Sequence, residues 1–288
     1  MTHTSFRRFI QSPFIQTLLG PKDTDKTGFG PVLAFAHKAV AERYADAEGN
    51  PPKVVRNDML GHFVRKGLSQ VQCEVEAKLQ IVAGADSTTT VLRSTLYTLA
   101  GSPSAYHKLQ SELDAASHSG QISGPIITHT EAQKLPYLQA CIWEGLRLHP
   151  PFVGLVSKLA PPAGETFKDV FYPPGTEVGF CWRRMCRRKD IFGEDAEFFR
   201  PERWLEGSQE QRARLRQCVD VVFGSGRFAC LGRLVAMMEL GKGLAEVSLS
   251  GVSTGNGLFK FDLLIFFLVA TAVDEEFRLD DRGSAQGD

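Results

Sequence analysis

The sequence lacks an excess of either charge, since its 288 residues contain 33 Lys and Arg and 33 Asp and Glu. A chain of this balance has no global basic surface for nucleic acid and no acidic run for a basic partner. It also lacks paired cysteine spacing. Its six cysteines are spread from Cys73 to Cys230, which is typical of a reduced compartment rather than of a disulfide scaffold.

Long apolar runs are scarce as well. The most apolar run, Leu263 to Val273 (LLIFFLVATAV), has eleven residues, whereas a membrane-spanning helix needs about 20. We interpret it as a buried helix or strand, with contact at a membrane surface as the alternative. The N-terminal residues 1–20 include Arg7 and Arg8 but no apolar segment typical of a signal peptide or membrane anchor.

The hydrophobic content of 43% is enough for a substantial core. Helical spacing predicts a mainly α protein, and short apolar pieces with prolines over 152–180 predict a small β part. Thr130 with Glu131 opens a further short helix that ends at Leu135–Pro136. Residues 49–52 and 117–130 are predicted to be loops. From Trp204 to residue 220, apolar residues show little regular spacing. The predicted helices cover residues 31–46, 69–99 with a break at 83–86, 103–116, 137–148 and 232–244.

Glu144 and Arg147 are three residues apart on the predicted helix 137–148, so their side chains share a face. Taken alone, this pair is a surface ion pair of small energy. Because Leu146 and other apolar residues lie on the same helix, burial is the alternative, and a buried pair needs further partners. Arg203 in PERW is a candidate third member, since a planar guanidinium suits a carboxylate, unless it is a solvated loop arginine.

The stretch AGADST, residues 83–88, interrupts an otherwise strong helical pattern. A glycine inside a helix costs about 1 kcal/mol relative to alanine, and Asp, Ser and Thr compete for backbone hydrogen bonds. Such local weakness marks either a kink or a functional site.

The stretch FGSGRFACLG, residues 223–232, places a cysteine in a glycine-rich turn before a predicted helix. A dinucleotide fingerprint would need a βαβ unit with an acid about 20 residues on; Glu246 is near that distance, but no clear second strand precedes it. Zinc would need more ligands, and Cys181 and Cys186 have no second pair. A single cysteine thiolate suits haem, whose porphyrin fills the equatorial positions, and Arg227 is placed to pair with a propionate.

Four motifs in this order, AGADST, E-x-x-R, PERW and FGSGRFACLG, resemble those of cytochrome P450 monooxygenases. The resemblance covers about residues 30–245, makes residues 1–288 one partial cytochrome P450 domain, and leaves 246–288 atypical. It implies the mainly α cytochrome P450 fold, truncated at its N-terminus. Two stretches are similar in sequence to fungal members of the pisatin demethylase-like kind: EAQKLPYLQACIWEGLRLHPP and IFGEDAEFFRPERWLE.

The resemblance implies a role for each motif residue. Cys230 is the axial thiolate of haem b (iron protoporphyrin IX), with electron density directed through the iron to favour O–O cleavage. Phe223 packs beside the thiolate and Arg227 reaches a propionate. The glycines that allow close approach of the haem are Gly224, Gly226 and Gly232.

The other motifs receive roles in the same way. Asp86 and Ser87 lie above the haem and deliver protons to bound oxygen. The family usually has threonine at position 87, so the neighbouring Thr88 is a second candidate. Ala83 and Gly84 leave room for oxygen over the iron. The structural cluster on the proximal side of the haem consists of Glu144, Arg147 and Arg203.

The implied reaction inserts one atom of O2 into a lipophilic small molecule, with electrons from NADPH-cytochrome P450 reductase. Arg187 and Arg188 are candidate contacts for that partner, with haem-propionate or solvent contact as the alternative. Full-length members work at the cytosolic face of the endoplasmic reticulum membrane; this chain, without an anchor, is expected in the cytoplasm.

Two departures from the family stand beside these expectations. The family is far longer before the oxygen-binding helix, and residues 243–257 fit no family pattern; one hypothesis is that they are translated intron or a faulty gene model. The alternatives are therefore a non-catalytic fragment and a haem-binding sensor or carrier.

Overall fold

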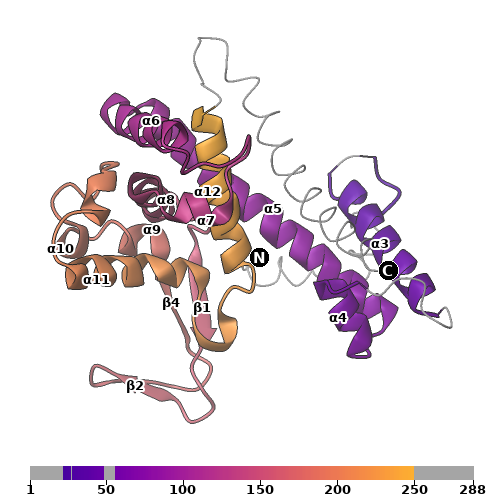
Figure 1. Ribbon diagram of the computed structural model, residues 1–288. Helices are drawn as coiled ribbons and strands as arrows, with labels where there is room; N and C mark the ends of the chain where they lie inside the picture. Colours follow the sequence, from indigo (N-terminus) through magenta and orange to yellow (C-terminus); the bar gives the residue numbers. More distant parts are fainter. Residues whose placement is uncertain (1–21, 27, 49–55, 250–288) are drawn as a thin grey trace. The chain divides into compact units, whose positions relative to one another are not determined.

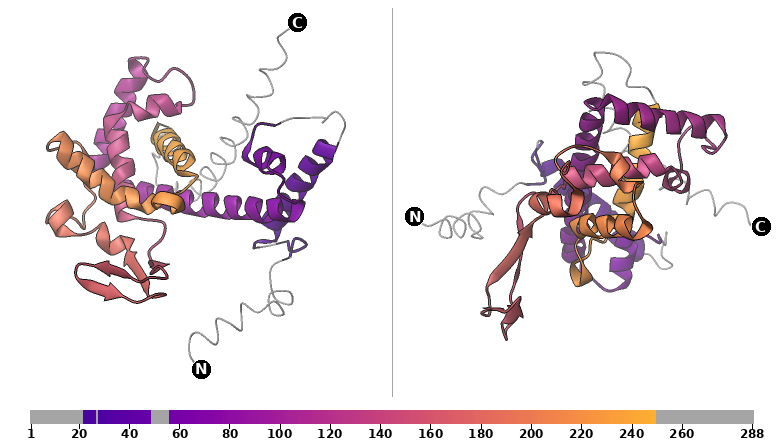
Figure 2. Two further views of the ribbon diagram at one scale, coloured as in Figure 1. Left: turned by 90° about the horizontal axis from the view of Figure 1, so that it is seen from below. Right: turned by 90° about the vertical axis from the view of Figure 1, so that its left-hand side faces the viewer.

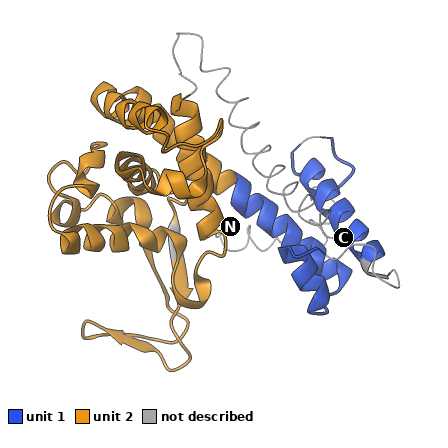
Figure 3. Ribbon diagram, viewed as in Figure 1, with its two compact units in different colours: residues 1–85 blue, residues 86–288 orange. Residues whose placement is uncertain are grey.

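The computed structural model describes residues 22–26, 28–48 and 56–249. The protein is mostly helical with a small sheet part, as the sequence predicts. The loop expected at 49–52 and the apolar run at 263–273 lie outside the described residues. The chain divides into two compact units, residues 1–85 and 86–288 (Figure 3).

The first unit contains α3 (Gly30–Glu48), α4 (Met59–Arg65) and the first part of α5 (Gln70–Ala100). The side chain of Asp58 caps α4 by accepting a hydrogen bond from the backbone N–H of Gly61 at 2.7 Å. Arg43 of α3 donates to the same carboxylate from both Nη atoms, at 2.6 and 2.7 Å. This hydrogen bond lowers the pKa of the Asp58 carboxyl below its ordinary value, and it holds α3 against α4.

Helix α5 is continuous, so the break expected at residues 83–86 is wrong. Its 31 residues provide backbone hydrogen bonds on both sides of Gly84, which outweigh the cost of about 1 kcal/mol for one glycine. Later threonines keep their hydroxyls within the helix. Thr95 Oγ1 donates to the carbonyl of Val91 at 2.7 Å, and Thr98 Oγ1 donates to that of Ser94 at 2.8 Å.

The second unit packs the last part of α5 and four further helices around one apolar core, and of these four α12 lies against the other three (Figures 1 and 2). Glu112 of α6 accepts hydrogen bonds from the backbone N–H groups of Tyr137 and Leu138, at 2.8 and 2.9 Å, and so caps α8 from a neighbouring helix. The four helices are α6 (Pro103–His118), α7 (His129–Gln133), α8 (Pro136–Leu148) and α12 (Arg233–Leu249).

Helix α7 begins at a different residue from the one expected. Its N-cap is Thr128 rather than Thr130, because Thr128 and Glu131 form a reciprocal capping box. The Glu131 carboxylate also accepts from the hydroxyl of Ser123 at 2.6 Å. That hydrogen bond, together with those from Thr128, lowers the pKa of Glu131 to about 2.

The β part consists of two antiparallel pairs. Strands β1 (Leu155–Leu159) and β4 (Glu177–Cys181) pair with Leu155 opposite Cys181. Strands β2 (Glu165–Phe167) and β3 (Val170–Tyr172) form a hairpin, which Figure 1 shows extending beyond the β1–β4 pair. Its turn places Lys168 and Asp169 at φ values of 50° and 64°.

The segment after β4 contains short helices and one helix that periodicity missed, α11 (Gln209–Asp220). It begins with a capping box between Ser208 and Gln211, and Val219 is its one fully buried residue, so the sequence shows little apolar spacing. The other elements are α9 (Trp182–Met185), α10 (Lys189–Phe192), and the 3-10 helices η1 (Pro201–Trp204), η2 (Val221–Phe223) and η3 (Gly226–Phe228).

Helix α12 continues five residues beyond its expected end at Leu244. The additional turn buries Ala245, Val247 and Ser248, and Glu246 accepts a hydrogen bond from the backbone N–H of Ile127 at 2.6 Å. Residues 243–249 thus belong to α12, and the rest of that stretch, 250–257, lies outside the described residues. None of the helices within the described ranges has the length and apolar character needed to cross a bilayer.

Candidate functional site: the cysteine loop and the buried ion-pair cluster

The cysteine loop, residues 223–232, connects η2 to α12 through two glycines in left-handed backbone conformations. Gly224 has φ +73°, and a Cβ there would overlap the carbonyl oxygen of Phe228, so this position requires glycine. Gly226 has φ +56° but faces open space. The backbone N–H of Cys230 donates to the carbonyl of Phe223 at 2.7 Å, which closes the loop beneath the cysteine.

Cys230 differs from the other cysteines in its environment. Of the six cysteines, all of which the structure describes, Cys73, Cys141 and Cys186 are buried and Cys230 is exposed. Burial raises the pKa of Cys141 well above its ordinary value and that of Cys186 to about 11, so both stay neutral thiols. Cys181 and Cys218 are half-buried, so the most exposed thiol is that of Cys230.

The loop residues fit a flat, largely apolar group bound through one sulfur. Within the described ranges, no cluster of three His, Cys, Asp or Glu side chains is arranged to hold a metal by itself. A metal at Cys230 thus needs most of its ligands from elsewhere, as a porphyrin provides. The large apolar side chains exposed around the cysteine are Phe228, Leu231, Leu234 and Val235, at 54%, 84%, 77% and 52%.

Arg227 lies beside the aromatic ring of Phe228, with its Cζ atom 4.7 Å from the ring centroid. Phe223, the last residue of η2, is half-buried and packs against the core. A Cβ at Gly232 would lie 3.9 Å from the Cys230 sulfur, an ordinary contact. The loop therefore has a cation, an apolar face and an exposed thiol within a few residues of one another.

The AGADST motif lies in the middle of α5, and the exposure of its residues decreases from residue 86 to residue 88. Ala83, Gly84 and Asp86 are exposed, Ser87 is half-buried and Thr88 is buried at 7%. A Cβ at Gly84 would meet no atom within 4 Å. The structure thus leaves Ala83 and Gly84 exposed on α5, while Thr88 is buried.

Glu144, Arg147 and Arg203 come together in one buried cluster. The Glu144 carboxylate accepts from Nε and Nη2 of Arg147 at 2.9 and 2.7 Å, and from Nε of Arg203 at 3.0 Å. The three side chains belong to α8 and η1, and the residues are 0%, 0% and 4% exposed. Charges buried to this degree persist only because each one has partners.

The sequence did not identify two further partners of this carboxylate. The indole Nε1 of Trp204 donates to Glu144 Oε2 at 2.9 Å, and the backbone N–H of Arg200 donates to Oε1 at 2.8 Å. The tryptophan of PERW could have indicated the first of these contacts, because a buried indole N–H needs a hydrogen-bond acceptor.

The two arginines of the cluster also bind the chain between β4 and η1. Most of their remaining N–H groups donate to main-chain carbonyls, and Arg203 also donates to Asp195 Oδ1 at 3.2 Å, so side chains hold this segment and its two short helices in place. Arg147 binds the carbonyls of Cys186, Ala196 and Phe198 at 2.9, 2.6 and 3.0 Å, and Arg203 binds that of Phe192 at 2.6 Å.

Arg187 and Arg188 have partners within the chain. Arg187 donates to the carbonyl of Leu148 at 2.7 Å and to Glu197 at 3.1 Å, and Arg188 pairs with Asp190. These contacts give both arginines a local structural function.

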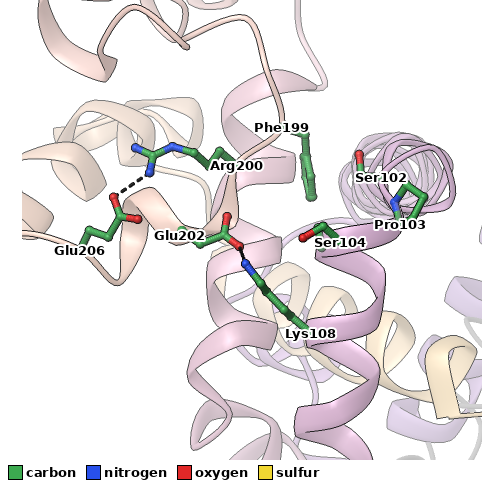
Figure 4. Close-up of a pocket in the computed structure, with 9 residues that line it drawn as sticks. Ser102, Pro103, Ser104, Lys108, Phe199, Arg200, Glu202 and Glu206 are labelled. Atoms are coloured by element: carbon green, nitrogen blue, oxygen red, sulfur yellow. Dashed lines mark hydrogen bonds and ion pairs between the residues drawn. The ribbon is translucent and has the colours of Figure 1, made fainter.

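A cavity of about 430 Å³ lies between the start of α6 and the segment around η1, and none of the predicted site residues lines it (Figure 4). Its charged residues already neutralise one another: Lys108 contacts Glu202 at 2.7 Å, and Arg200 contacts Glu206 at 2.6 Å. It contains no residue of the cysteine loop, and we assign it no role.

Comparison with known proteins identifies the class. The sequence profile of the family named Cytochrome P450 matches residues 4–247, and the chain belongs to this family, whose members bind haem. It is 46% identical over 237 residues to cytochrome P450 monooxygenase ABA1 of Pyricularia oryzae, covering 82% of this chain and 45% of that protein.

Other fungal relatives are also cytochrome P450 monooxygenases. The chain is 43% identical over 241 residues to cytochrome P450 monooxygenase aba1 of Botryotinia fuckeliana, covering 84% of this chain and 46% of that protein. It is 35% identical over 222 residues to cytochrome P450 monooxygenase mpaDE of Penicillium brevicompactum, covering 75% of this chain and 26% of that protein. The chain therefore spans less than half the length of these curated relatives.

Proposed function

We propose that this protein is a haem-thiolate monooxygenase that acts on a lipophilic small molecule. One atom of O2 enters a C–H bond of the substrate; the other leaves as water with two protons and two electrons. The electrons come from NADPH through NADPH-cytochrome P450 reductase. The exposed Cys230, held in a glycine turn among apolar and cationic side chains, is the observation that carries this proposal.

Cys230 supplies the thiolate that ligates the iron of haem b, and the bound haem supplies the oxygen chemistry. Phe223 would pack beside the sulfur when haem is bound. Gly224 and Gly226 keep the loop open for a flat group, and Arg227 binds a carboxylate of the porphyrin. The hydrogen bond from the Cys230 N–H to the Phe223 carbonyl fixes the position of the sulfur.

On α5, Asp86 and Ser87 move protons toward the reacting oxygen, and the buried Thr88 orients its neighbours. Ala83 and Gly84 leave space for oxygen. Glu144, Arg147 and Arg203 act structurally, because they hold the segment that leads to η1 and the cysteine loop. These assignments rest on the motifs and on the burial of each side chain.

A non-catalytic cytochrome P450 fragment is the second candidate. Two observations favour it. The chain spans only 45% of the Pyricularia oryzae relative. Apolar side chains are also exposed on α5, where Val71, Val75 and Leu79 are 69%, 58% and 58% exposed. We also propose, from the resemblance to fungal members, a pisatin demethylase-like placement and action at the cytosolic face of the endoplasmic reticulum membrane.

The optical spectrum of the reduced chain with carbon monoxide tests the central proposal. With haem supplied, wild type and Cys181→Ser should show the strongly red-shifted Soret band of a thiolate ligand, and Cys230→Ser should lose it. Cys181 is the matched control because it is a cysteine that is not fully buried. A band typical of a neutral ligand in the wild type would favour the fragment.

Substitution of Asp86 and Ser87 separates a monooxygenase from a haem-binding carrier. Asp86→Asn with Ser87→Ala should retain haem and the red-shifted band but lose product formation per electron consumed, since proton delivery is impaired. Unchanged turnover would remove these two residues from the mechanism.

A further inference from the structure

Ser69, in the short connection between α4 and α5, has an exposed side chain. Its backbone N–H and its Oγ atom both donate to Oε1 of Gln72, at 2.8 and 3.1 Å. Because these hydrogen bonds are exposed to water, each adds little net free energy and is readily exchanged for another partner. The hydroxyl of Ser69 is therefore accessible to chemistry from outside the chain.

Two cations precede this serine without an ion-pair partner. Arg65, the last residue of α4, and Lys66 are both exposed. Arg65 donates to the carbonyl of Arg56 at 3.1 Å, and neither cation has a carboxylate partner among the described residues. In the same unit, Arg43 does pair with Asp58, at 2.6 Å. Free cations shortly before a serine are a charge pattern by which protein kinases with an acidic groove select their substrates.

Ser208 shows that the geometry around Ser69 does not by itself define such a site. Ser208 is also exposed and also precedes a helix, and its backbone N–H donates to Oε1 of Gln211 at 2.8 Å. The four residues before it, 204–207, include Glu206 and no cation. The two serines thus share their hydrogen bonds and differ in the charges that precede them.

The segment around Ser69 can open without loss of the fold. Helix α4 has seven residues, a length at which a helix has little stability of its own. Gly67, in the connection, has φ +80°, and a Cβ there would meet no atom within 4 Å. Local opening at helix ends costs far less than global unfolding. Residues 65–69 can therefore enter a kinase groove as an extended segment.

We propose that Ser69 is a phosphorylation site for a serine/threonine kinase that recognises the chain through Arg65 and Lys66. The Ser69 Oγ atom forms a bond to the γ-phosphorus of ATP, the bond from that phosphorus to the bridging oxygen of the β-phosphate breaks, ADP leaves, and the hydroxyl proton passes to the catalytic aspartate of the kinase. The phosphate adds about 1.5 to 2 negative charges at pH 7. This regulatory site goes beyond the proposed oxygen chemistry and does not depend on haem.

Phosphate transfer from MgATP to the full chain, mapped by mass spectrometry, tests the proposal. Two kinases that select basic residues before serine serve as probes, AMP-activated protein kinase and cyclic-AMP-dependent protein kinase. At least one of them should modify Ser69, and neither should modify Ser208. Arg65→Gln with Lys66→Gln should lower kcat/KM at Ser69 about tenfold or more, because two charge-assisted contacts are lost. Lys38→Gln is the control for loss of charge, because Lys38 is an exposed lysine on α3.

The alternative outcomes are distinct. Absence of phosphate on Ser69 with both kinases would refute the proposal, and equal modification of Ser69 and Ser208 would show that the preceding charges do not select the site. An unchanged rate in the double glutamine variant would exclude Arg65 and Lys66 from recognition. Ser69→Thr should still accept phosphate and Ser69→Ala should not, with circular dichroism to show that both variants keep the helical content of the wild type.

Discussion

Trp204 and Glu144 are 60 positions apart in the chain, yet the indole Nε1 donates to Glu144 Oε2 at 2.9 Å with both residues almost completely buried. The carboxylate thereby receives a neutral donor as well as two guanidinium groups. A buried charge with this set of partners is costly to disturb, because removal of the Glu144 charge leaves the buried Arg147 without a carboxylate partner.

Glu144→Gln should therefore lower the free energy of unfolding by about 3–5 kcal/mol. Urea unfolding measured by tryptophan fluorescence is a suitable assay. Glu210→Gln is the control, because Glu210 and Arg214 form a pair that is about three-quarters exposed on each side, and its loss should cost about 0.5 kcal/mol or less. Similar losses for the two variants would contradict the importance of burial.

The two glycines of the cysteine loop should respond differently to alanine. Gly224→Ala combines a left-handed φ with overlap on the Phe228 carbonyl and should cost about 2 kcal/mol or more, with loss of haem. Gly226→Ala has only the backbone strain and should cost about 1 kcal/mol. Thermal unfolding and haem content measure both effects, and equal behaviour of the pair would show that the overlap is relieved by a shift of the loop.

Gly145 on α8 faces Thr95 on α5 so closely that a Cβ at 145 would overlap the threonine hydroxyl. Gly145→Ala should destabilise the protein by about 1–3 kcal/mol through overpacking, although alanine favours a helix. Combination with Thr95→Ala should recover part of that loss, since the overlapping atom is gone. A double-mutant cycle measures this coupling, and strictly additive losses would argue against direct contact.

His149 should make stability depend on pH. Its Nε2 atom lies 2.8 Å from Oγ1 of Thr98, and burial, followed by the nearby Arg187 and Arg147, lowers its pKa below the ordinary value of 6.5. The folded state therefore binds the proton less readily than the unfolded state. The stabilisation is complete above about pH 6.5 and is lost as the pH falls from there through the folded pKa.

Urea unfolding between pH 7.5 and pH 5, a range chosen about the ordinary histidine pKa, tests this sign. His149→Gln should flatten the decrease of unfolding free energy on acidification, and the exposed His107→Gln should leave the decrease as in wild type. A steeper decrease in His149→Gln would reverse the assignment.

Local signals predicted much of the fold. The spacing of apolar residues located α3, α6 and α8 to within a few residues, because those helices bury a continuous face. The same rule missed α11, whose buried surface is small and whose start is defined by the capping box of Ser208 and Gln211. It also wrongly predicted a break in α5 at Gly84, because the backbone hydrogen bonds of the rest of the helix outweigh the free-energy cost of one glycine.

In the candidate site too, local patterns predicted some contacts and missed others. Residue types and spacing suggested Glu144 and Arg147 as a pair, since both lie on one helix. The backbone N–H of Arg200 and the cation contact of Lys158 with Phe228 join elements far apart in sequence, and no local pattern encodes such contacts. Long-range contacts of this kind depend on how the elements pack, which periodicity does not describe.

The order in which Glu144 meets its partners has a consequence for synthesis on the ribosome. Arg147 follows within one turn, but Trp204 is made 60 residues later. At about 5–20 residues per second, the carboxylate waits about 3–12 s for its indole donor. Water must therefore solvate the Glu144 carboxylate during that interval, and α8 cannot bury its apolar face around this charge until the indole donor is available.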